Sequence, residues 1–347
     1  MSDGVLSRRN FMSVAGVAAA GVLVNEARAD ETAQNDSPRL PMKLLLRGGV
    51  KGDFVQQIKA LSPDITIERD IPLTDADALF GNISEHELST AKNLRWVQCQ
   101  SAGVEHYPLD AMADRDIILT NAQGCYGPQI AEHVFGLLFA MTRGIGALSR
   151  KRAWQVDRDP IELRGMTMGI IGLGGIGREV ARRAKAMDMK VLAVDAEPIF
   201  VEKFAMVDEV RLVDDGLMDL LKASNVVVSA APHTRKSRGM LGVEQFAAMK
   251  EGSYFINVSR GKLVQTDALL EALKSNHLAG AGLDVTDPEP LPADHPLWRQ
   301  DNAVLTPHIA GRSQLGDHRM QTVFAQNVAR YVAKLPMLNI VDKRKGY

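Results

Sequence analysis

The sequence is poor in the residues that build disulfide frameworks and metal sites, and it has no long apolar run. Its only cysteines are Cys99 and Cys125, with no C-x-x-C pair and no cluster of cysteine and histidine. This pattern argues against a disulfide framework and a zinc site, so we expect no metal and interpret both cysteines as buried thiols. No apolar stretch reaches the roughly 20 residues that a transmembrane helix needs, so no membrane span is expected.

Charge is nearly balanced along the chain. The 41 basic and 42 acidic side chains give a formal net charge of −1, and no stripe of basic residues stands out. Nucleic acid is therefore not an expected partner. With 347 residues, the chain is long enough for two domains that each have a full core.

The N-terminus has the layout of a signal peptide. Paired arginines in S-R-R-N-F-M precede an uncharged stretch at 11–24 that is rich in Ala, Gly and Val, and Ala27-Arg-Ala29 follows as a small-x-small cleavage site. The arginine pair is similar to a twin-arginine export signal, in which a weakly hydrophobic core is also expected. We therefore predict a signal peptide at 1–29.

A signal peptide implies a periplasmic or exported protein that meets the export machinery through its N-terminus. A polar linker that contains two prolines is expected at 30–41. The alternative is an uncleaved tail or a misplaced start, because Met42 would make a plausible N-terminus. The protein would be cytoplasmic if the signal is not used.

From Met42 onward, short apolar runs alternate with helical patterns, which predicts an α/β fold with parallel sheets. We expect the first part of a substrate domain at 42–146. Its predicted strands lie at 43–46, 65–68, 94–99 and 117–121, and its predicted helices at 53–61 and 128–142. Gly144 and Gly146 follow the second helix and mark a candidate hinge.

A second domain, at 147–311, has enough predicted strands for a full doubly wound sheet. These strands lie at 166–171, 190–195, 209–213, 225–229, 254–258, 280–285 and 304–306. The last segment, 312–347, contains a helix that we expect to return to the substrate domain. The predicted fold is α/β, with two Rossmann- or flavodoxin-like parallel-sheet domains and the active-site cleft between them.

A glycine-rich turn begins the second domain. Gly172, Gly174 and Gly177 match G-x-G-x-x-G between a predicted strand and a predicted helix, where bare backbone lets a pyrophosphate approach the helix N-terminus. Asp195 ends the next strand, where an acidic side chain would hold a ribose hydroxyl. Because Asp195 should repel a 2′-phosphate, NAD is preferred to NADP, and the arginine pair at 182–183 weakens this preference only slightly.

Three residues in the last third of the chain could carry the chemistry of keto acid reduction: Arg260, Glu289 and His308. A guanidinium can hold carboxylate and carbonyl oxygens in a planar fork. The histidine can protonate the developing alkoxide, and a neighbouring carboxylate would fix its tautomer and stabilise its protonated form. Each of these residue types alone is more often structural or solvated. The three become evidence for this chemistry only because a glycine-rich turn typical of a dinucleotide site precedes them.

Several motifs occur in a fixed order along the chain. They are S-A-G-V-E-H at 101–106, N-A-Q-G-C-Y-G-P-Q-I-A-E-H-V at 121–134, L-R-G-M-T-M-G-I-I-G-L-G-G-I-G at 163–177, P-H-T-R-K-S-R-G at 232–239, N-V-S-R-G at 257–261, A-G-A-G-L-D-V-T-D-P-E-P-L-P at 279–292 and T-P-H-I-A-G at 306–311. On these motifs the chain resembles the D-isomer-specific 2-hydroxyacid dehydrogenases, and the resemblance covers almost everything from Met42 to the C-terminal helix.

The resemblance implies that the chain interconverts a 2-keto acid and a D-2-hydroxy acid by hydride transfer with NAD. His308 would be the general acid for reduction and the general base for oxidation, Glu289 its partner, and Arg260 the group that orients the substrate. The turn formed by Ser101, Ala102, Gly103 and Val104 would offer backbone N–H groups to the substrate carboxylate. The implied cofactor-binding residues are Gly172, Gly174, Gly175, Ile176, Gly177, Asp195, Ala231, Pro232, Val258, Arg260, Asp284 and His308.

The helix at 128–142 resembles the dimer helix of this family, so a homodimer is expected, although its apolar stripe could instead be ordinary core. His133 on this helix is interpreted as packing. The sequence departs from the family pattern at Gly175, where arginine is frequent, and at His233 and Ser237, where leucine and threonine are frequent.

Two alternatives stay open. The chain could be a nucleotide-sensing binding protein on the same fold, although an export signal argues against a DNA role. An exported enzyme could also hold a tightly bound NAD(P) and recycle it between two substrates, because free NAD is scarce outside the cytoplasm. Glyoxylate, hydroxypyruvate, pyruvate-like and bulkier keto acids all satisfy the same three residues.

Overall fold

A computed structural model of the chain describes residues 41–48, 52–156, 159–197 and 206–347. The predicted signal peptide at 1–29 and nearly all of the predicted linker at 30–41 lie outside these residues. The described chain divides into two compact units. Unit 1 contains the residues up to Cys125 together with Gln314–Tyr347, and unit 2 is Tyr126–Ser313.

Unit 1 is built on a parallel sheet of five short strands in the order β2-β1-β3-β4-β5. The strands are β1 Met42–Leu46, β2 Ile65–Glu68, β3 Ala78–Phe80, β4 Trp96–Gln98 and β5 Ile118–Thr120, and the helices are α2 Gly52–Lys59, α3 Glu85–Thr90, α4 Leu109–Ala113 and α11 Gly316–Val332, with a 3-10 turn at Leu73–Asp75. This is one of the two common doubly wound strand orders. All residues of β3 and β4 are buried, as expected for a parallel sheet that is covered on both faces.

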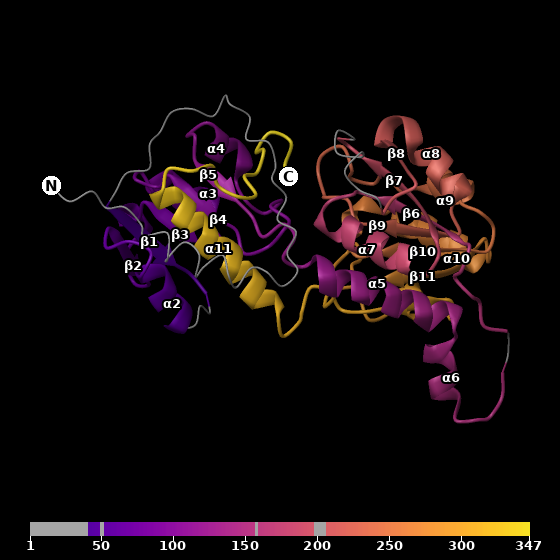
Figure 1. Cartoon of the computed structure of the whole chain (residues 1–347). Helices are drawn as coiled ribbons and strands as arrows, with labels where there is room; N and C mark the ends of the chain where they lie inside the picture. The colour runs from indigo at the N-terminus through magenta and orange to yellow at the C-terminus, as the bar shows by residue number, and fades with distance from the viewer. Residues whose placement is uncertain (1–40, 49–51, 157–158, 198–205) are drawn as a thin grey trace. The chain divides into compact units, whose positions relative to one another are not determined.

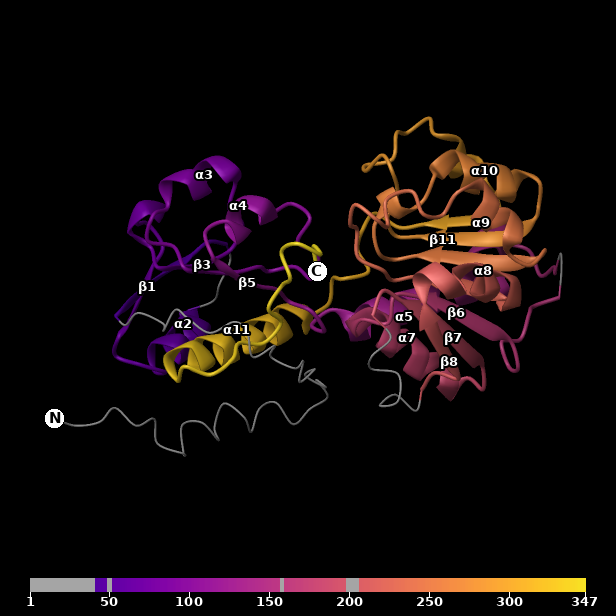
Figure 2. The ribbon, with the colours of Figure 1, turned by 90° about the horizontal axis from the view of Figure 1, so that it is seen from above.

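The C-terminal helix α11 packs on unit 1 beside α2, as both ribbon views show (Figures 1 and 2). The ring of Phe324 lies 4.4 Å from that of Phe80, centroid to centroid, and the side chain of Phe324 is fully buried. The buried Asn327 donates from Nδ2 to Gln98 Oε1 at 3.0 Å and accepts from Leu338 N at 2.7 Å. Apolar contact and a satisfied buried amide together hold the last helix against strand β4.

Unit 2 is built on a parallel sheet of seven strands in the order β12-β11-β10-β9-β6-β7-β8. The strands are β6 Thr167–Ile171, β7 Lys190–Asp195, β8 Glu209–Leu212, β9 Val226–Ser229, β10 Ser253–Asn257, β11 Leu278–Leu283 and β12 Ala303–Leu305. Strands β7 and β8 are added on one side of β6, and the later strands, from β9 onward, are added on its other side. The order of the strands in the sheet therefore reverses at β6. Ligands of open α/β sheets bind at the carboxyl ends of the strands beside such a reversal.

The prediction of an α/β fold with two parallel-sheet domains is confirmed. The helices of unit 2 are α5 Gly127–Thr142, α6 Ile145–Lys151, α7 Gly175–Ala186, α8 Val213–Ala223, α9 Val243–Ala248 and α10 Thr266–Lys274, with 3-10 turns at Gly261–Leu263 and Pro296–Arg299. The strands predicted from apolar runs at 166–306 match β6 to β12 within two residues at each end. Buried parallel strands read as continuous apolar runs, which explains this agreement.

Helix α5 lies in unit 2, so the division of the chain falls before Tyr126 and not at the predicted boundary after 146. The apolar stripe of α5 is buried in the core of unit 2: Ile130, Val134, Leu137, Leu138 and Met141. Close packing against α7 is also required at Gly127, where a Cβ would lie 2.7 Å from the carbonyl oxygen of Gly175. The stripe expected to form a dimer surface is therefore core.

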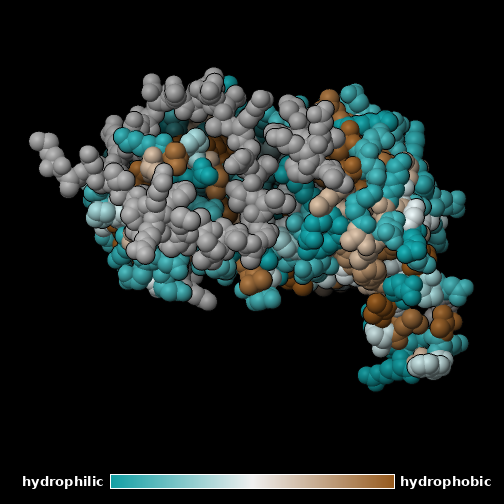
Figure 3. Space-filling view, in the orientation of Figure 1, coloured by the Kyte–Doolittle hydropathy of each residue, from teal (hydrophilic) through white to brown (hydrophobic). Residues whose placement is uncertain are grey.

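Helix α6 projects from the rest of unit 2 (Figure 1) and buries none of its side chains. Hydrophobic residues lie among hydrophilic ones on this projection (Figure 3). Ile145 on α6 and Trp154 and Val156 beyond it are exposed. Large apolar side chains in water are a common mark of a contact surface.

The two cysteines lie in unit 1 and are buried, as predicted, and both are free thiols. Burial raises the pKa of the Cys125 thiol to about 12 and raises the pKa of the Cys99 thiol as well. Both thiols therefore stay protonated and unreactive near neutral pH. No helix within the described ranges combines the length and the apolar character needed to cross a membrane.

Candidate active site

The predicted cofactor and catalytic residues of unit 2 follow the ends of six strands. Gly172 follows β6, Asp195 ends β7, Ala231 and Pro232 follow β9, Val258 and Arg260 follow β10, Asp284 and Glu289 follow β11, and His308 follows β12. Because the strands are parallel, their carboxyl ends meet at one edge of the sheet. The fold thus gathers these residues along one edge, around the reversal at β6.

The turn after β6 allows close approach of backbone. Gly172 has a φ of +94°, and a Cβ there would lie 2.7 Å from the backbone of Ala231 in the loop after β9. A Cβ at Gly177 would lie 2.1 Å from the carbonyl oxygen of Gly172. Helix α7 begins at Gly175, so its first N–H groups point out at this turn. These features fit a pyrophosphate at the helix N-terminus.

Asp195 holds the glycine-rich turn in place. Its Oδ2 accepts from Leu173 N at 2.6 Å, and its Oδ1 accepts from Glu197 N at 3.1 Å. Arg178 donates from Nε to the Leu173 carbonyl at 2.9 Å. The acidic side chain expected at the ribose therefore lies directly against the turn expected at the pyrophosphate.

Arg260 is held by a buried network. Asn257 Nδ2 donates to the Arg260 carbonyl at 3.1 Å, and Asn257 Oδ1 accepts from Ser259 Oγ at 2.9 Å. Ser259 Oγ also lies 2.9 Å from Ser229 Oγ on the neighbouring strand. Gly261 is required beside Arg260 because a Cβ there would lie 1.9 Å from the Thr286 carbonyl oxygen. The N-V-S-R-G motif thus fixes the backbone from which the guanidinium extends.

His308 and Glu289 form the expected pair, with Nδ1 of the imidazole 2.5 Å from Oε1 of the carboxylate. An ionised carboxylate only accepts hydrogen bonds, so Nδ1 carries the hydrogen and Nε2 is left to exchange a proton. The side chains of His308 and Glu289 are 47% and 40% exposed. A pair with this exposure is open to a ligand and to proton exchange.

The loop that carries His308 is fixed by Asp284, which is 2% exposed. The Asp284 carboxylate accepts from Thr306 Oγ1 at 2.6 Å and from the backbone N–H groups of Ile309 and Ala310, both at 2.9 Å. These bonds offset the cost of the left-handed backbone at His308, where φ is +51°. Asp284 therefore has a positioning role in addition to the expected role in cofactor binding.

His133 of α5 reaches the same network, with Nε2 2.8 Å from Thr306 Oγ1. The Thr306 hydroxyl has one hydrogen, and the acceptor-only Asp284 carboxylate takes it. Nε2 of His133 must therefore donate to Thr306. His133, interpreted from the sequence as a packing residue, supports the loop of His308 through two linked hydrogen bonds, from His133 to Thr306 and from Thr306 to Asp284.

The predicted substrate turn lies in unit 1, directly beyond strand β4. Ser101 Oγ donates to the Gly103 carbonyl at 2.7 Å, and Asn121 Nδ2 donates to the Ala102 carbonyl at 2.7 Å. Within the described residues, the backbone N–H groups of Ala102, Gly103 and Val104 have no protein acceptor. A run of open N–H groups held by fixed carbonyls is suited to an anion.

The sequence did not reveal the residues that hold this site: Asn257, Ser229 and Thr306. Asn257 and Thr306 stand inside the motifs N-V-S-R-G and T-P-H, so a signal was present but was not interpreted. Ser229 ends the apolar run V-V-V-S and is fully buried. A polar residue at the end of a buried strand needs a partner, and this rule could have drawn attention to it.

Comparison with known protein families adds a finding about most of unit 2. The family model described as D-isomer specific 2-hydroxyacid dehydrogenase, NAD binding domain, matches residues 135–310. This range contains Gly172 to Gly177, Asp195, Arg260, Glu289 and His308. The order of motifs that suggested the resemblance is thus matched across half of the chain.

Individual relatives cover more of the chain. A D-3-phosphoglycerate dehydrogenase of Archaeoglobus fulgidus is 35% identical over 280 residues, which are 79% of this chain and 52% of that protein, so the chain spans about half of its length. A glyoxylate reductase of Thermofilum pendens is 34% identical over 74% of this chain and 78% of its own length. The crystal structure of a D-isomer specific 2-hydroxyacid dehydrogenase family protein from Aeromonas salmonicida is 31% identical, with a TM-score of 0.75 over 87% of this chain and 99% of that one.

Proposed function

Because the chain belongs to the D-isomer-specific 2-hydroxyacid dehydrogenase family and is an NAD-dependent oxidoreductase, we propose that it interconverts a 2-keto acid and a D-2-hydroxy acid. NAD, when bound, would supply hydride for reduction and accept it in oxidation. The single observation that carries this proposal is the contact of His308 with Glu289 at 2.5 Å. It leaves Nε2 of an exposed imidazole free to exchange a proton.

Each of the other groups has a role that its surroundings support. Arg260 orients the keto acid through its carboxylate and carbonyl oxygens, because a guanidinium matches these oxygens as a fork. The open N–H groups at 102–104 in unit 1 are suited to a carboxylate group of a substrate. His308 then protonates the carbonyl oxygen in reduction, and it removes the hydroxyl proton in oxidation.

The residues present fit NAD better than NADP. Asp195 lies against the glycine-rich turn and would repel a 2′-phosphate. Two of the three arginines of α7 are engaged by Glu179: Arg182 lies 2.8 Å from Glu179 Oε2, and Arg183 contacts the same carboxylate oxygen. The preference follows from charge, and parallel assays with NADH and NADPH measure it.

Replacement of His308 tests the proposal. His308→Ala should lower kcat by about 10²- to 10⁴-fold in an assay that follows NADH absorbance with a panel of 2-keto acids, while NADH binding is kept. His318→Ala, at an exposed position of α11, is the control. Near wild-type turnover by His308→Ala would refute the role of this residue. NADH binding without turnover on any keto acid would favour a nucleotide-sensing protein.

We also propose that the chain is exported and retains a tightly held cofactor. The support is the signal-like sequence at 1–29 together with a nucleotide site in a folded domain, since twin-arginine export moves folded proteins. Protein purified from the periplasm should lack residues 1–29 and should release stoichiometric NAD on denaturation. An unprocessed cytoplasmic product would exclude export, and an empty site with weak NAD affinity would exclude a retained cofactor.

A homodimer is the third part of the proposal. Because the apolar stripe of α5 is core, the dimer surface must use other residues, and the exposed Ile145, Trp154 and Val156 are the best suited. Light scattering after gel filtration should give a dimer for the wild type and a shift toward monomer for Trp154→Asp. A wild-type monomer at all concentrations would contradict this assembly.

A further inference from the structure

Unit 1 contains a cavity at the carboxyl ends of its central strands, with several polar side chains in its lining. Its volume is about 500 Å³, within the range of small-molecule sites. The cavity is lined by Arg47, Gly48, Gly81, Asn82, Ile83, Ser84, Glu87, Gln100 and His106. Gln100 and His106 flank the proposed substrate turn at 101–104. A substrate whose carboxylate lies on that turn has this cavity as its neighbour within unit 1.

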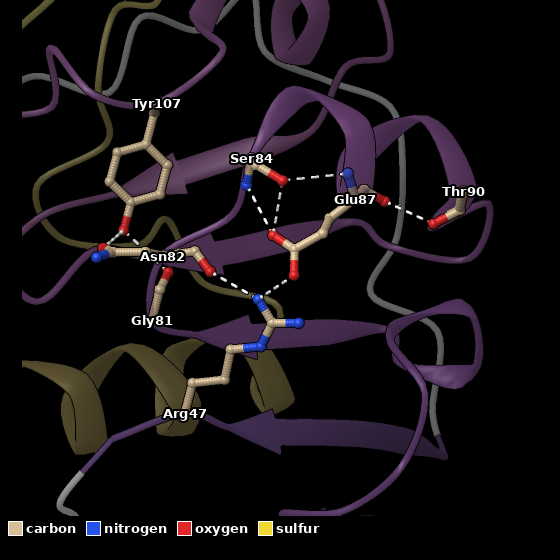
Figure 4. Close-up of polar contacts among 7 residues, drawn as sticks. All are labelled: Arg47, Gly81, Asn82, Ser84, Glu87, Thr90 and Tyr107. Atoms are coloured by element: carbon tan, nitrogen blue, oxygen red, sulfur yellow. Dashed lines mark hydrogen bonds and ion pairs between the residues drawn. The ribbon is translucent and has the colours of Figure 1, made fainter.

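An ion pair crosses one wall of the cavity (Figure 4). Arg47 extends from the end of β1 and places Nη1 2.9 Å from Glu87 Oε1 and 3.0 Å from the Asn82 carbonyl oxygen. The two side chains are 35% and 37% exposed. Arg47 is therefore accessible to a ligand, but its charge is already matched by a carboxylate.

Glu87 is held in place by a second set of contacts. Its other oxygen, Oε2, accepts from Ser84 N and from Ser84 Oγ, both at 2.9 Å, which closes the capping box at the start of α3. The backbone hydrogen bond from Ser84 is the main cause that keeps the pKa of Glu87 below its usual value, with Arg47 also lowering it. Glu87 is thus negatively charged near neutral pH and cannot swing away without losing the cap.

The other polar side chains of the cavity include Asn82 and His106, which contact each other. Asn82 Oδ1 lies 3.3 Å from His106 Nε2 and accepts from Tyr107 OH at 3.0 Å. An amide oxygen only accepts, so Nε2 of His106 carries the hydrogen in this contact. Among the described lining residues, the titratable side chains are Arg47, Glu87 and His106, and the first two cancel in charge.

We propose that this cavity takes the side chain of the 2-keto acid, and that the Arg47–Glu87 pair makes it select an uncharged polar side chain over an anionic one. This inference rests on the proposed function. A phosphate or carboxylate on the substrate would have to displace Glu87 from Arg47 and would meet the Glu87 charge at close range, which is a repulsive device for specificity. A hydroxyl group would add hydrogen bonds without disturbing the pair.

The test compares kcat/KM for 3-hydroxypyruvate and for its 3-phospho ester in the full chain with NADH. The wild type should prefer the hydroxyl compound. Glu87→Gln removes the charge but keeps an acceptor for Ser84, since glutamine also serves a capping box. This variant should shift the preference toward the phospho ester by ~10-fold or more, mainly through KM.

Two further variants make the result specific. Glu85→Gln changes the charge of α3 equally at an exposed residue outside the cavity lining, and it should leave the preference as in the wild type. Adding Arg47→Gln to Glu87→Gln should abolish the gain for the phospho ester, because the freed guanidinium is its source.

Each outcome separates the two levels of the proposal. An unchanged preference in Glu87→Gln, in an enzyme that still depends on His308, would overturn the inference and leave the proposed function standing. A gain that persists without Arg47 would overturn it as well. A wild type that reduces no keto acid would overturn both.

Discussion

The two units hold their functional residues in different ways. In unit 2, the loop of His308 is held by Asp284, which is 2% exposed and accepts three hydrogen bonds. In unit 1, the cavity wall depends on Arg47 and Glu87, which are 35% and 37% exposed. A buried carboxylate cannot be removed without leaving donors unpaired, whereas an exposed ion pair contributes little to stability.

This difference separates reaction geometry from substrate choice. The proposed proton donor, His308, sits where small displacements are costly, because misplacement of a reacting group by about 1 Å can lower a rate about 10²-fold. The substrate side chain meets residues that can change with little effect on folding. A single scaffold can therefore keep one reaction while its substrate preference varies.

The largest expected effect tests how closely the backbone is packed at the glycine-rich turn of unit 2. Gly177→Ala should destabilise the protein by about 3 kcal/mol or more and abolish NADH binding, because its Cβ would lie 2.1 Å from the Gly172 carbonyl oxygen. Thermal unfolding and a fluorescence titration with NADH measure both effects. Gly136→Ala on α5 is the matched control, since a Cβ there meets nothing within 4 Å. Equal behaviour of the two variants would show that the turn can adapt.

A smaller effect is expected at the buried carboxylate. Asp284→Asn turns one acceptor into a donor that faces Thr306, Ile309 or Ala310, which should cost about 1–3 kcal/mol in unfolding free energy. The loop of His308 should then relax and lower kcat by about 10- to 100-fold. Urea unfolding and steady-state kinetics check this, with the exposed Asp301→Asn as control. Wild-type kinetics in Asp284→Asn would show that the loop of His308 is no more rigidly held than the cavity wall of unit 1.

The sequence predicted the strands of unit 2 because buried parallel strands are long apolar runs and the glycine-rich turn marks where they begin. It did not predict β3, whose three residues, Ala78–Phe80, lie after a polar stretch and before Gly81. It also placed α5 in the wrong unit, because an apolar stripe says that a face is buried but not which sheet covers it. Only the packed structure supplies that information.

In the candidate site, too, some residues could be predicted from the sequence and others could not. His308, Glu289 and Arg260 could be assigned because their residue types suit a known chemistry and their motifs occur in order. The contact between Arg47 and Glu87 could not be predicted, because the two residues lie on separate elements. The S-x-x-E pattern at Ser84 and Glu87 signals only the start of a helix. Long-range pairs of common surface residues leave no periodic signal in a sequence.

The smallest expected effect concerns the stability of that pair. Glu87→Gln should lower the free energy of unfolding by less than about 1 kcal/mol near neutral pH, as for other exposed ion pairs. Because the folded-state pKa of Glu87 is lowered, chiefly by the Ser84 backbone hydrogen bond, its contribution is present above the ordinary value of 4.5 and is lost as the pH falls below it. Urea unfolding of both proteins near neutral pH and again below pH 4.5 should therefore show a small difference that shrinks on acidification. A loss of several kcal/mol near neutral pH would mean that the wall of the cavity is as firmly built into the fold as Asp284, and substrate choice would then be no freer to change than the reaction itself.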